Sequence, residues 1–462
     1  MRNEKIMRNE KINALSLEWT TYASRDRLCA TLVCNYLKFM GYNVKEGSIF
    51  NSLTLIKKYK PDVVFISNSI GAKENIETVK YAKSIGVKVL TLISEGSFQT
   101  EDEYFLNEVI WGWNKEKILR EDVQMQWSLR SRNLTLKHFP QLKGKIKISG
   151  GVGFDNYKII QNIPKDKILK KWKKHNYKKI IGIGLPDFGC VCYPEDHRYQ
   201  FQYNYYGEEQ IQRFGRDRML FNEILNEIIS KNKEVLFILK EHPGVLLGEK
   251  ASGIEGLKKY ENVIIIKDEV SIIECIAISD IWIVYESTTA LEAWLLNKKT
   301  CLLNPTGREF LRDVVNLGSP HIETTNEFNE LINKFYKNGD IDGFTERKNK
   351  REEIIERMIQ WSDGLNHVRA GNELIDLINE NKNIDNIYQN EKKQDKYIRI
   401  RQNMGWHLNR VLYRFGIKRR PFIGKWDERE LELFSKVKKN EQINYYEKLG
   451  LNQNKLLKIK SI

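Results

Sequence analysis

The sequence predicts an α/β fold of two facing, doubly wound Rossmann-like domains, followed by a basic helical C-terminal tail. Three observations lead to this prediction. Apolar strand patterns alternate with amphipathic helix patterns, which is typical of a parallel sheet covered on both faces. The alternation stops near residue 150 and begins again at residue 178. The chain also has 462 residues, more than a single hydrophobic core usually serves.

The first domain is expected over residues 12–160. Its helices are expected at 25–40 and 76–85, and Gly41 and Gly86 follow them where a helix C-cap favours glycine. A tryptophan-rich region separates the fourth strand from the fifth, and no element is assigned within it. The strands are expected at 12–18, from 42, at 61–68, 88–94 and 145–149.

The second domain is expected over residues 161–345, with a helix inside 207–230. Residues 346–385 are expected to form helices that pack back across the domain junction. A polar stretch follows, and residues 395–462 form the predicted basic tail. The strands of the second domain are expected at 178–185, 234–240, 263–266, 281–285 and 300–303.

Composition excludes several classes of protein. With 41% hydrophobic and 30% charged residues, the chain resembles neither a disordered tail nor a membrane bundle. No apolar run reaches the roughly 18 residues of a spanning helix. Six cysteines and the lack of a secretory signal pattern lead us to expect a reduced, cytoplasmic protein. The hexapeptide MRNEKI occurs twice in succession, so translation can start at Met1 or at Met7.

The sharpest motif is Lys240-Glu241-His242-Pro243-Gly244, directly after an apolar strand. Proline and glycine end the strand abruptly and leave His242 at the carboxyl edge of the sheet. An imidazole there can donate to a phosphate oxygen, and Lys240 adds positive charge. The alternative is a histidine that only ties down its own turn.

A second motif, Ser287-Thr288-Thr289-Ala290, lies between a buried strand and a helix. Hydroxyl residues at this position often serve as N-caps. The same geometry directs amides and hydroxyls at an anion, as at a donor phosphate. We expect the two motifs on neighbouring strand ends of one sheet. Flanking carboxylates that could contact a ribose or sugar are Glu286 and Glu292.

The third motif, Ser94-Glu95-Gly96, follows a strand of the first domain. If Glu95 faces the cleft between the domains, it could act as general base on an acceptor hydroxyl. The alternative is a solvated glutamate in a turn.

Other patterns point less clearly to chemistry. Arg213, Arg216 and Arg218 lie in a segment rich in tyrosine and arginine, which could line a sugar or base site or simply pack as a loop. Cys190-Val191-Cys192 with His197 supplies only part of a zinc ligand set, so no metal is expected. Neither GxGxxG after the first strand nor a P-loop is present, which argues against NAD or ATP chemistry.

Together these motifs resemble the GT-B glycosyltransferases of bacterial surface-carbohydrate biosynthesis. The similar clan includes polysialyltransferases, capsule 3-deoxy-manno-octulosonate transferases and CDP-glycerol glycerophosphotransferases. Its acidic-acidic-Gly, His-Pro and Ser-Ser/Thr motifs correspond here to 94–96, 242–243 and 287–288. The segment KIKISGGVGFDNY resembles the stretch that enters the second domain in these proteins. Two positions depart from the pattern, because Ser94 replaces the first acid and Val152-Gly153 replaces an arginine.

The resemblance implies a GT-B-like fold and transfer of a sugar from a nucleotide donor, a CMP-activated acidic sugar or another nucleotide sugar. The implied acceptor is a surface polysaccharide or glycolipid of the capsule or lipopolysaccharide type. His242, Ser287 and Thr288 would bind the donor phosphate, Glu95 would deprotonate the acceptor, and no metal or other cofactor would be needed. Alternatives are a CDP-glycerol-type phosphotransferase, a sugar-nucleotide 2-epimerase and an inactive membrane-bound scaffold.

The tail carries most of the excess positive charge. Residues 395–462 hold 17 Lys/Arg and 7 Asp/Glu, a net +10 out of +15 for the chain. The spacing predicts a basic amphipathic helix on an anionic membrane surface, which would make the protein peripheral on the inner face of the cytoplasmic membrane. One alternative is a basic helix docked on the catalytic body. Nucleic-acid binding is a third possibility, and we do not expect it. The residues involved are Arg399, Arg401, Arg410, Arg414, Lys418, Arg419 and Arg420, with Trp406, Leu408, Leu412, Tyr413, Phe415 and Ile417.

Overall fold

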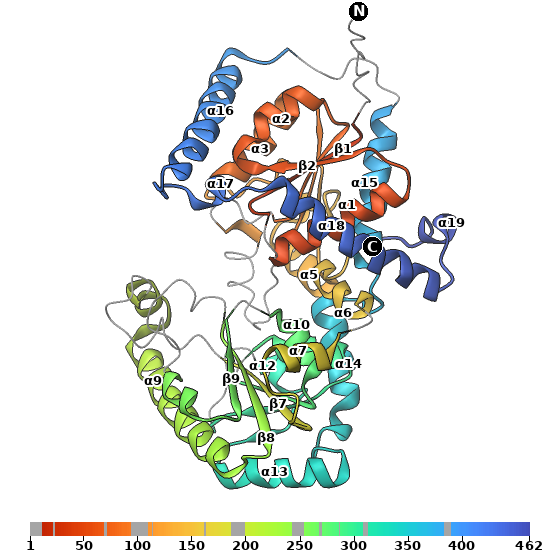
Figure 1. The fold of residues 1–462 in the computed structure, drawn as a ribbon. Coiled ribbons are helices and arrows are strands. Elements are labelled where there is room, and N and C mark those ends of the chain that lie inside the picture. The colour runs from red at the N-terminus through yellow and green to blue at the C-terminus, as the bar shows by residue number, and fades with distance from the viewer. Residues whose placement is uncertain are drawn as a thin grey trace, which may run out of the picture. The chain divides into compact units, whose positions relative to one another are not determined.

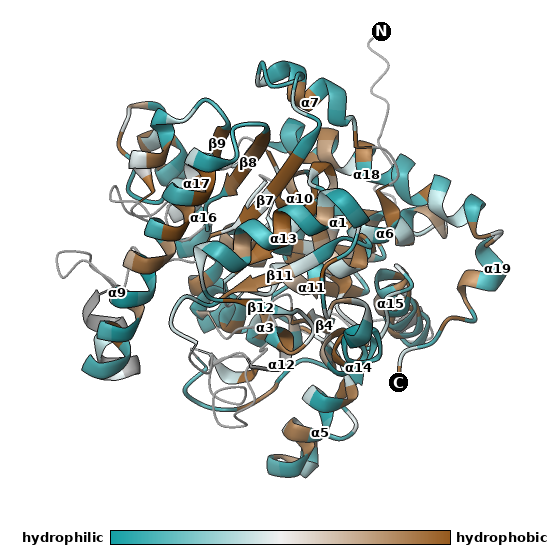
Figure 2. Ribbon diagram, turned by 90° about the horizontal axis from the view of Figure 1, so that it is seen from below, coloured by the Kyte–Doolittle hydropathy of each residue, from teal (hydrophilic) through white to brown (hydrophobic). Residues whose placement is uncertain are grey.

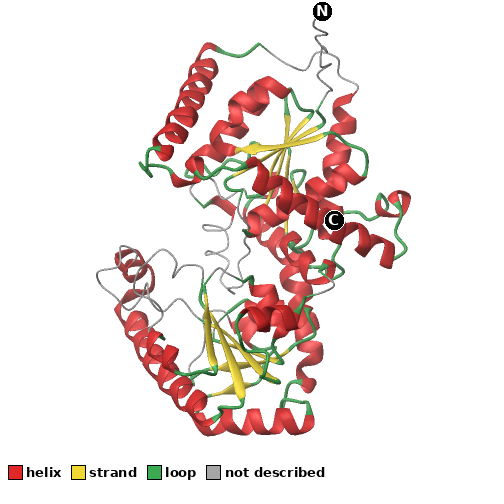
Figure 3. Cartoon of the chain, in the orientation of Figure 1, coloured by secondary structure: helices red, strands yellow, loops and turns green. Residues whose placement is uncertain are grey.

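The structure is a computed structural model, and its described residues form two compact units. The first unit contains residues up to 159 and again from 356 to 462, and the second contains 160–355. Each has one parallel sheet enclosed by helices, drawn as yellow strands among red helices in Figure 3. The described residues are 12–21, 24–68, 72–93, 110–112, 114–160, 163–185, 199–242, 254–267, 270–285, 287–307, 313–382 and 390–462.

The first unit is built on six parallel strands in the order β2-β1-β3-β4-β5-β6. The chain starts at β1, moves to one edge and then runs towards the other, so the order reverses between β1 and β3. Open α/β sheets bind ligands beyond the carboxyl ends of the strands at such a reversal. The strands are β1 (Ala14–Glu18), β2 (Val44–Ser48), β3 (Val63–Ile66), β4 (Lys88–Leu92), β5 (Val123–Gln126) and β6 (Ile146–Ile148).

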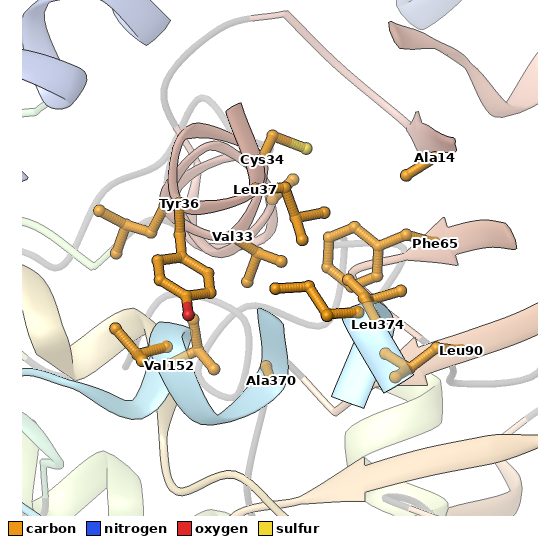
Figure 4. Close-up of a cluster of buried hydrophobic side chains, with 14 of the residues drawn as sticks. Ala14, Val33, Cys34, Tyr36, Leu37, Phe65, Leu90, Val152, Ala370 and Leu374 are labelled. Carbon is orange, nitrogen blue, oxygen red and sulfur yellow. The ribbon is translucent and has the colours of Figure 1, made fainter. Parts of the chain in front are cut away.

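Helices cover both faces of this sheet. On one face α1 (Arg25–Phe39) packs beside α15 (Asn366–Lys382), and Val33 and Leu37 meet Phe65, Leu90 and Leu374 in a buried core (Figure 4). The alternate residues of the strands point to the other face. There they form a second core with the two helices that follow α1 in the chain. These and the remaining elements of the amino-terminal part are α2 (Ser52–Tyr59), α3 (Lys73–Ser84), α5 (Leu129–His138), α6 (Asn156–Ile159), η1 (Ile49–Asn51), η3 (Pro140–Leu142) and η4 (Val152–Asp155).

Residues 393–462 pack on the first unit rather than forming an appendage outside it. Figure 1 shows α16 (Lys393–Arg414) beside α2, while α18 (Glu428–Lys448) packs on α1. Trp406 and Trp426 are buried in one core, and Tyr446 is buried in the other. Ile462 exchanges backbone hydrogen bonds of 2.8 and 3.3 Å with Ile148 at the edge of the sheet. Two short helices complete this part, α17 (Pro421–Gly424) and α19 (Gln453–Leu456).

The second unit has its own six parallel strands, in the order β12-β11-β10-β7-β8-β9. This order reverses between β7 and β10. The central strands are apolar and appear brown in Figure 2, as expected for strands covered on both faces. The strands are β7 (Lys179–Gly184), β8 (Val235–Lys240), β9 (Val263–Ile266), β10 (Ile281–Val284), β11 (Lys299–Leu303) and β12 (His321–Ile322).

The long helix α9 (Tyr199–Lys231) connects β7 to β8 and bends at Gly207, where φ is 78°. The helix α14 (Lys348–Ile359) begins in the second unit and ends in the first. The fold class predicted from the sequence, an α/β chain of two doubly wound domains, is confirmed. The other elements of this unit are α7 (Lys165–Lys171), α10 (Ile272–Ile278), α11 (Thr289–Leu295), α12 (Asp313–Asn316), α13 (Thr325–Asn338), η6 (Glu255–Lys259) and η7 (Thr345–Arg347).

Candidate functional site

The hydroxyl motif lies at the reversal point of the second sheet. Ser287 and Thr288 follow β10, Thr289 begins α11, and all three residues are half-buried. Because α11 has only seven residues, its dipole is short, and the hydroxyl groups are the stronger attraction for an anion. The motif therefore occupies the position at which doubly wound sheets bind their ligands.

Hydrogen bonds within this motif leave one hydroxyl proton for an outside acceptor. The indole Nε1 of Trp282 donates to Thr289 Oγ1 at 3.1 Å, and Thr289 N donates to Ser287 Oγ at 3.3 Å. The two hydroxyls share one hydrogen bond of 3.0 Å, in which either can donate. Whichever hydroxyl donates, the proton of the other remains for an acceptor beyond the pair.

Gly184, the last residue of β7, makes room for this arrangement. A Cβ added to Gly184 would come within 2.8 Å of Thr289 Oγ1, which is closer than Cβ atoms normally approach other atoms. Any larger residue would therefore displace the hydroxyl. Glycine at this position therefore lets the backbone at the end of β7 lie close to the hydroxyl motif.

Asp217 is a residue of this site that sequence reasoning missed. It lies on α9, is fully buried, and accepts hydrogen bonds from the Tyr285 hydroxyl and, at 2.5 Å, from Thr306 Oγ1. Tyr285 follows β10 and Thr306 follows β11, so the carboxylate joins two strand ends to the helix. A signal was present, because Asp217 falls on the buried face of α9 between Phe214 and Phe221.

His242 lies at the same edge of the sheet, two positions after the end of β8, and is exposed. The expectation that it neighbours the hydroxyl motif is wrong in one respect, because β7 lies between β8 and β10. With strands about 4.8 Å apart, the two strand ends are separated by about 10 Å. A ligand that contacts both must bridge the end of β7.

Lys240 is directed to the outer side of its strand. Its ammonium donates to the backbone carbonyls of Glu241, at 3.1 Å, and of Lys267 after β9. Glu241 is buried, and its backbone N–H donates to Ile266 O at 2.9 Å. These contacts tie the end of β8 to β9, on the side away from β10.

The remaining predicted site residues are spread more widely. Arg213 and Arg216 are exposed on α9, and Arg213 lies 3.9 Å from Glu209. Arg218 is half-buried on the same helix. Glu292, expected at a ribose or in solvent, is buried on α11. Several predictions fall outside the described residues: Glu95 with its motif, Glu286, Pro243, Gly244, Cys190, Cys192 and His197.

The first sheet carries a buried carboxyl at its own reversal point. Glu18 ends β1 and is fully buried, with Ser67 Oγ donating to Oε2 at 2.6 Å and Ser16 Oγ donating to Oε1 at 3.2 Å. Burial raises the pKa of Glu18 to about 8, although the charge of Arg27 and the bond from Ser67 act to lower it. The sequence contained a signal, because Glu18 is a carboxylate at the end of a predicted strand. The same criterion had singled out Glu95 in the first domain.

Charged and amide groups surround this carboxyl. Arg27 is buried, donates to Thr31 Oγ1 and forms an ion pair with Glu46 of β2. After β3, Asn68 Nδ2 donates to Asp26 Oδ2 at 3.0 Å, which links this strand end to the start of α1. The carboxyl ends of β1 and β3 are therefore joined by a network of polar side chains.

A small open cavity of about 30 Å³ lies next to this network. Asn75 in its wall accepts a hydrogen bond from Trp19 Nε1 at 3.2 Å and donates to Asn68 O at 2.5 Å. Glu121 also lines the cavity; burial raises its pKa, and Thr91 Oγ1 donates to it at 3.1 Å. The cavity is lined by both apolar and polar side chains, and its volume is enough only for ordered water.

The described residues contain neither a membrane-spanning helix nor a cluster of metal ligands. None of their helices is long and apolar enough to span a bilayer. No group of three or more His, Cys, Asp or Glu side chains gathers among them in a metal-binding arrangement.

No protein-family model matches the chain, and no curated protein is significantly similar to it. Solved structures are similar in fold. A predicted UDP-N-acetylglucosamine 2-epimerase from Listeria monocytogenes has a TM-score of 0.51 and 11% identity, over 83% of this chain and 100% of its own. Another UDP-N-acetylglucosamine 2-epimerase has a TM-score of 0.50 and 12% identity, over 82% and 100%. S. aureus MnaA, solved with UDP, has a TM-score of 0.50 and 12% identity, over 80% and 97%.

The chain has a GT-B fold. This agrees with the fold that the sequence motifs implied, whereas identities this low carry no activity from one protein to the other. In the second domain of this GT-B chain, the hydroxyl motif and His242 lie at one edge of one sheet.

Proposed function

We propose that this GT-B chain is a nucleotide-sugar-dependent enzyme whose second unit binds the nucleotide through its phosphates. The observation that carries the proposal is the spare hydroxyl proton of the Ser287–Thr289 pair at the reversal point of the sheet. A phosphate oxygen is a strong acceptor for such a proton, and hydrogen bonds to charged groups are about twice as strong as neutral ones. Gly184 leaves the space that the Thr289 hydroxyl occupies, which keeps this donor in place.

The spacing of the strand ends favours a diphosphate. His242 and Ser287 follow strands separated by β7, whose backbones lie about 10 Å apart, so a longer anion reaches both side chains more easily. A nucleoside diphosphate sugar has two phosphates to reach both groups, whereas a CMP-activated sugar has one. The CMP donor implied by the sequence resemblance therefore becomes the alternative, and a UDP- or CDP-linked donor is our first choice.

The reaction that we propose is glycosyl transfer to a surface polysaccharide or glycolipid. The acceptor hydroxyl loses its proton to a base, for which Glu95 remains our candidate, and its oxygen bonds to the anomeric carbon. The bond from that carbon to the donor phosphate breaks, and the phosphate leaves with the electron pair. Donors at the reversal point stabilise the charge that develops on this leaving phosphate, with no metal required.

A sugar-nucleotide 2-epimerase is the second candidate. The solved structures of similar fold favour it, because two of them are described as UDP-N-acetylglucosamine 2-epimerases and a third was solved with UDP. The two candidates share the nucleotide site and differ in whether a second substrate takes part.

Nucleotide binding is the first test. We expect UDP or CDP to raise the melting temperature of the full chain more than CMP does. Ser287→Ala should lower the affinity for the preferred nucleotide at least about tenfold, which corresponds to about 1.4 kcal/mol. Gly184→Ala should lower the nucleotide affinity to a similar extent, because the added Cβ would displace the Thr289 hydroxyl. Thermal shift and calorimetric titration measure both effects.

Ser230→Ala is the matched control for this test. Ser230 lies near the carboxyl end of α9, where its hydroxyl donates to Glu227 O at 2.8 Å. Removing this hydroxyl should leave the nucleotide affinity unchanged. A larger shift with CMP would restore the CMP-sugar donor. Equal affinity of Ser287→Ala and the parent chain would remove the hydroxyl motif from the site.

Turnover separates the two candidate reactions. As a transferase, the chain should release nucleotide from the donor only when a cell-envelope glycan is added, and His242→Ala should slow this release at least about tenfold. Chromatography of the nucleotide products measures the release. Conversion of UDP-N-acetylglucosamine to its 2-epimer without an acceptor would favour the epimerase instead. Unchanged turnover in His242→Ala would remove this histidine from the chemistry.

A further inference from the structure

The helix α16 exposes a continuous row of large apolar side chains. They recur every three or four residues and therefore lie on one face of the helix. Their exposed fractions range from 44% to 78%, which is far above what buried core positions show. We call this row the α16 stripe; it consists of Tyr397, Ile400, Met404, Leu408 and Val411 on the helix and Phe415 directly after its end.

The opposite face of α16 is docked, which fixes the direction in which the stripe points. Trp406 is buried and meets Trp426 edge-on, with ring centroids 6.2 Å apart. Gln402 accepts from Leu53 N at 3.0 Å and donates to Ser52 Oγ at 3.2 Å, which binds the helix to the start of α2. The helix thus buries one face against the first unit and turns the stripe outward.

This assignment differs from the faces read from the sequence. The sequence predicted one amphipathic helix whose apolar residues are Trp406, Leu408, Leu412, Tyr413, Phe415 and Ile417. The structure buries Trp406 and half-buries Leu412 and Tyr413, whereas Leu408 and Phe415, which the sequence also singled out, belong to the stripe. The exposed face therefore contains residues that the reading did not single out.

Positive charge surrounds the stripe. Between residues 393 and 425 the chain has ten Lys/Arg and one acidic residue, Asp395. Lys396, Arg401 and Arg414 are exposed on α16, and Arg401 lies 3.8 Å from Glu77. Directly after the helix, the exposed cations Lys418, Arg419 and Arg420 stand between the exposed apolar residues Ile417 and Phe422.

We propose that the α16 stripe and the cationic loop after it dock the protein on an anionic lipid surface. Six apolar side chains can enter the interface between headgroups and acyl chains while the surrounding cations contact lipid phosphates. A second copy fits less well, because a two-fold contact would bring the same cations together. Nucleic acid would satisfy the cations but would leave the apolar row uncovered.

Vesicle binding by the full chain tests this proposal, and it requires no assumption about the reaction. We expect the protein to sediment with vesicles of phosphatidylcholine and phosphatidylglycerol at least about tenfold more strongly than with phosphatidylcholine alone. Added salt should weaken binding, because it screens the cations. Equal binding to both kinds of vesicle, or to neither, would overturn the proposal.

Paired substitutions identify the surface. Met404→Glu with Leu408→Glu should lower vesicle binding at least about tenfold, since two carboxylates enter the stripe. The matched control is Leu433→Glu with Val437→Glu, which changes two residues at the same spacing on α18 that are 67% and 56% exposed. This control should bind vesicles like the parent chain. Equal loss in both pairs, or no loss in the α16 pair, would contradict the assignment.

Two outcomes would identify a different occupant. If the parent chain is a dimer in solution and the α16 pair makes it monomeric while vesicle binding is absent, the stripe binds a second copy. If the parent chain binds a DNA or RNA oligonucleotide more tightly than vesicles, the cations serve nucleic acid. Either result would replace the lipid proposal, and light scattering and fluorescence anisotropy measure them.

Discussion

His367→Ala should destabilise the first unit by about 3–5 kcal/mol, because it leaves a buried carboxyl without its main partner. His367 and Asp155 are both fully buried, and Asp155 Oδ2 accepts from His367 N at 2.6 Å and bonds its ring Nδ1 at 2.7 Å. The other ring nitrogen, Nε2, bonds the buried hydroxyl of Tyr446. The imidazole therefore connects η4, α15 and α18 in a single network.

Urea denaturation of the full chain measures this effect, with tryptophan fluorescence and circular dichroism as signals. Tyr446→Phe is the graded control, because it removes one hydroxyl and keeps the ring, and it should cost only about 1 kcal/mol. A His367→Ala chain within about 1 kcal/mol of the parent chain would show that Asp155 is satisfied in another way.

This network also gives a structural role to a segment that the sequence resemblance treated as an entry to the second domain. In GVGFDNY, Phe154 packs edge-on against Trp127, with centroids 5.3 Å apart, and Asp155 binds His367. Both contacts lie within the first unit. The acidic residue of the motif thus anchors the returning helix α15, and no sequence pattern relates positions 155 and 367.

Strands with a clear apolar pattern could be predicted to within a residue or two. Val63–Ile66 and Val263–Ile266 are continuous apolar runs, and such runs are typical of strands buried on both faces. The strand β5 was missed because it reads VQMQ, which has a polar residue at every second position. Both glutamines are nevertheless buried. Burial is tolerated because hydrogen bonds satisfy their amides; Gln126 Nε2, for example, donates to Thr135 Oγ1 at 3.0 Å. Such side-chain partners are settled only by the tertiary structure.

The candidate site was predictable where it depends on strand ends and not where it depends on packing. Ser287, Thr289 and His242 follow apolar strands, so local sequence places them at the carboxyl edge of a sheet. The order of the strands is not local information, and for this reason the intervening β7 was not foreseen. The apolar spacing around Asp217 indicated a buried position, but its partners Tyr285 and Thr306 are distant in sequence and could not be inferred.

Glu18→Gln should stabilise the first unit at neutral pH and remove much of its dependence on pH. The pKa of Glu18 rises from 4.5 to about 8 in the folded chain, because burial disfavours the carboxylate. Between these two values the folded state holds a proton that the unfolded state has lost. The free energy of unfolding therefore falls as pH rises through this window, by about 1.4 kcal/mol per pH unit.

Glutamine is the apt replacement because it is neutral at every pH and matches the protonated carboxyl in size. Its amide can keep contact with both Ser67 and Ser16, since a hydroxyl can donate or accept. Urea denaturation across the window should give a falling line for the parent chain and a flatter one for Glu18→Gln. Glu432→Gln, at an exposed position on α18, makes the same change of charge and should keep the slope of the parent chain.

The same substitution distinguishes two chemical roles for this carboxyl. A group that stays protonated near neutral pH can donate a proton but cannot accept one, so Glu18 at the reversal point of the first sheet would serve as an acid rather than a base. Parallel slopes for Glu18→Gln and the parent chain would mean that the folded chain holds a carboxylate there, stabilised by Arg27. In that case Glu18 would join Glu95 as a candidate base, and the turnover of Glu18→Gln would separate the two residues.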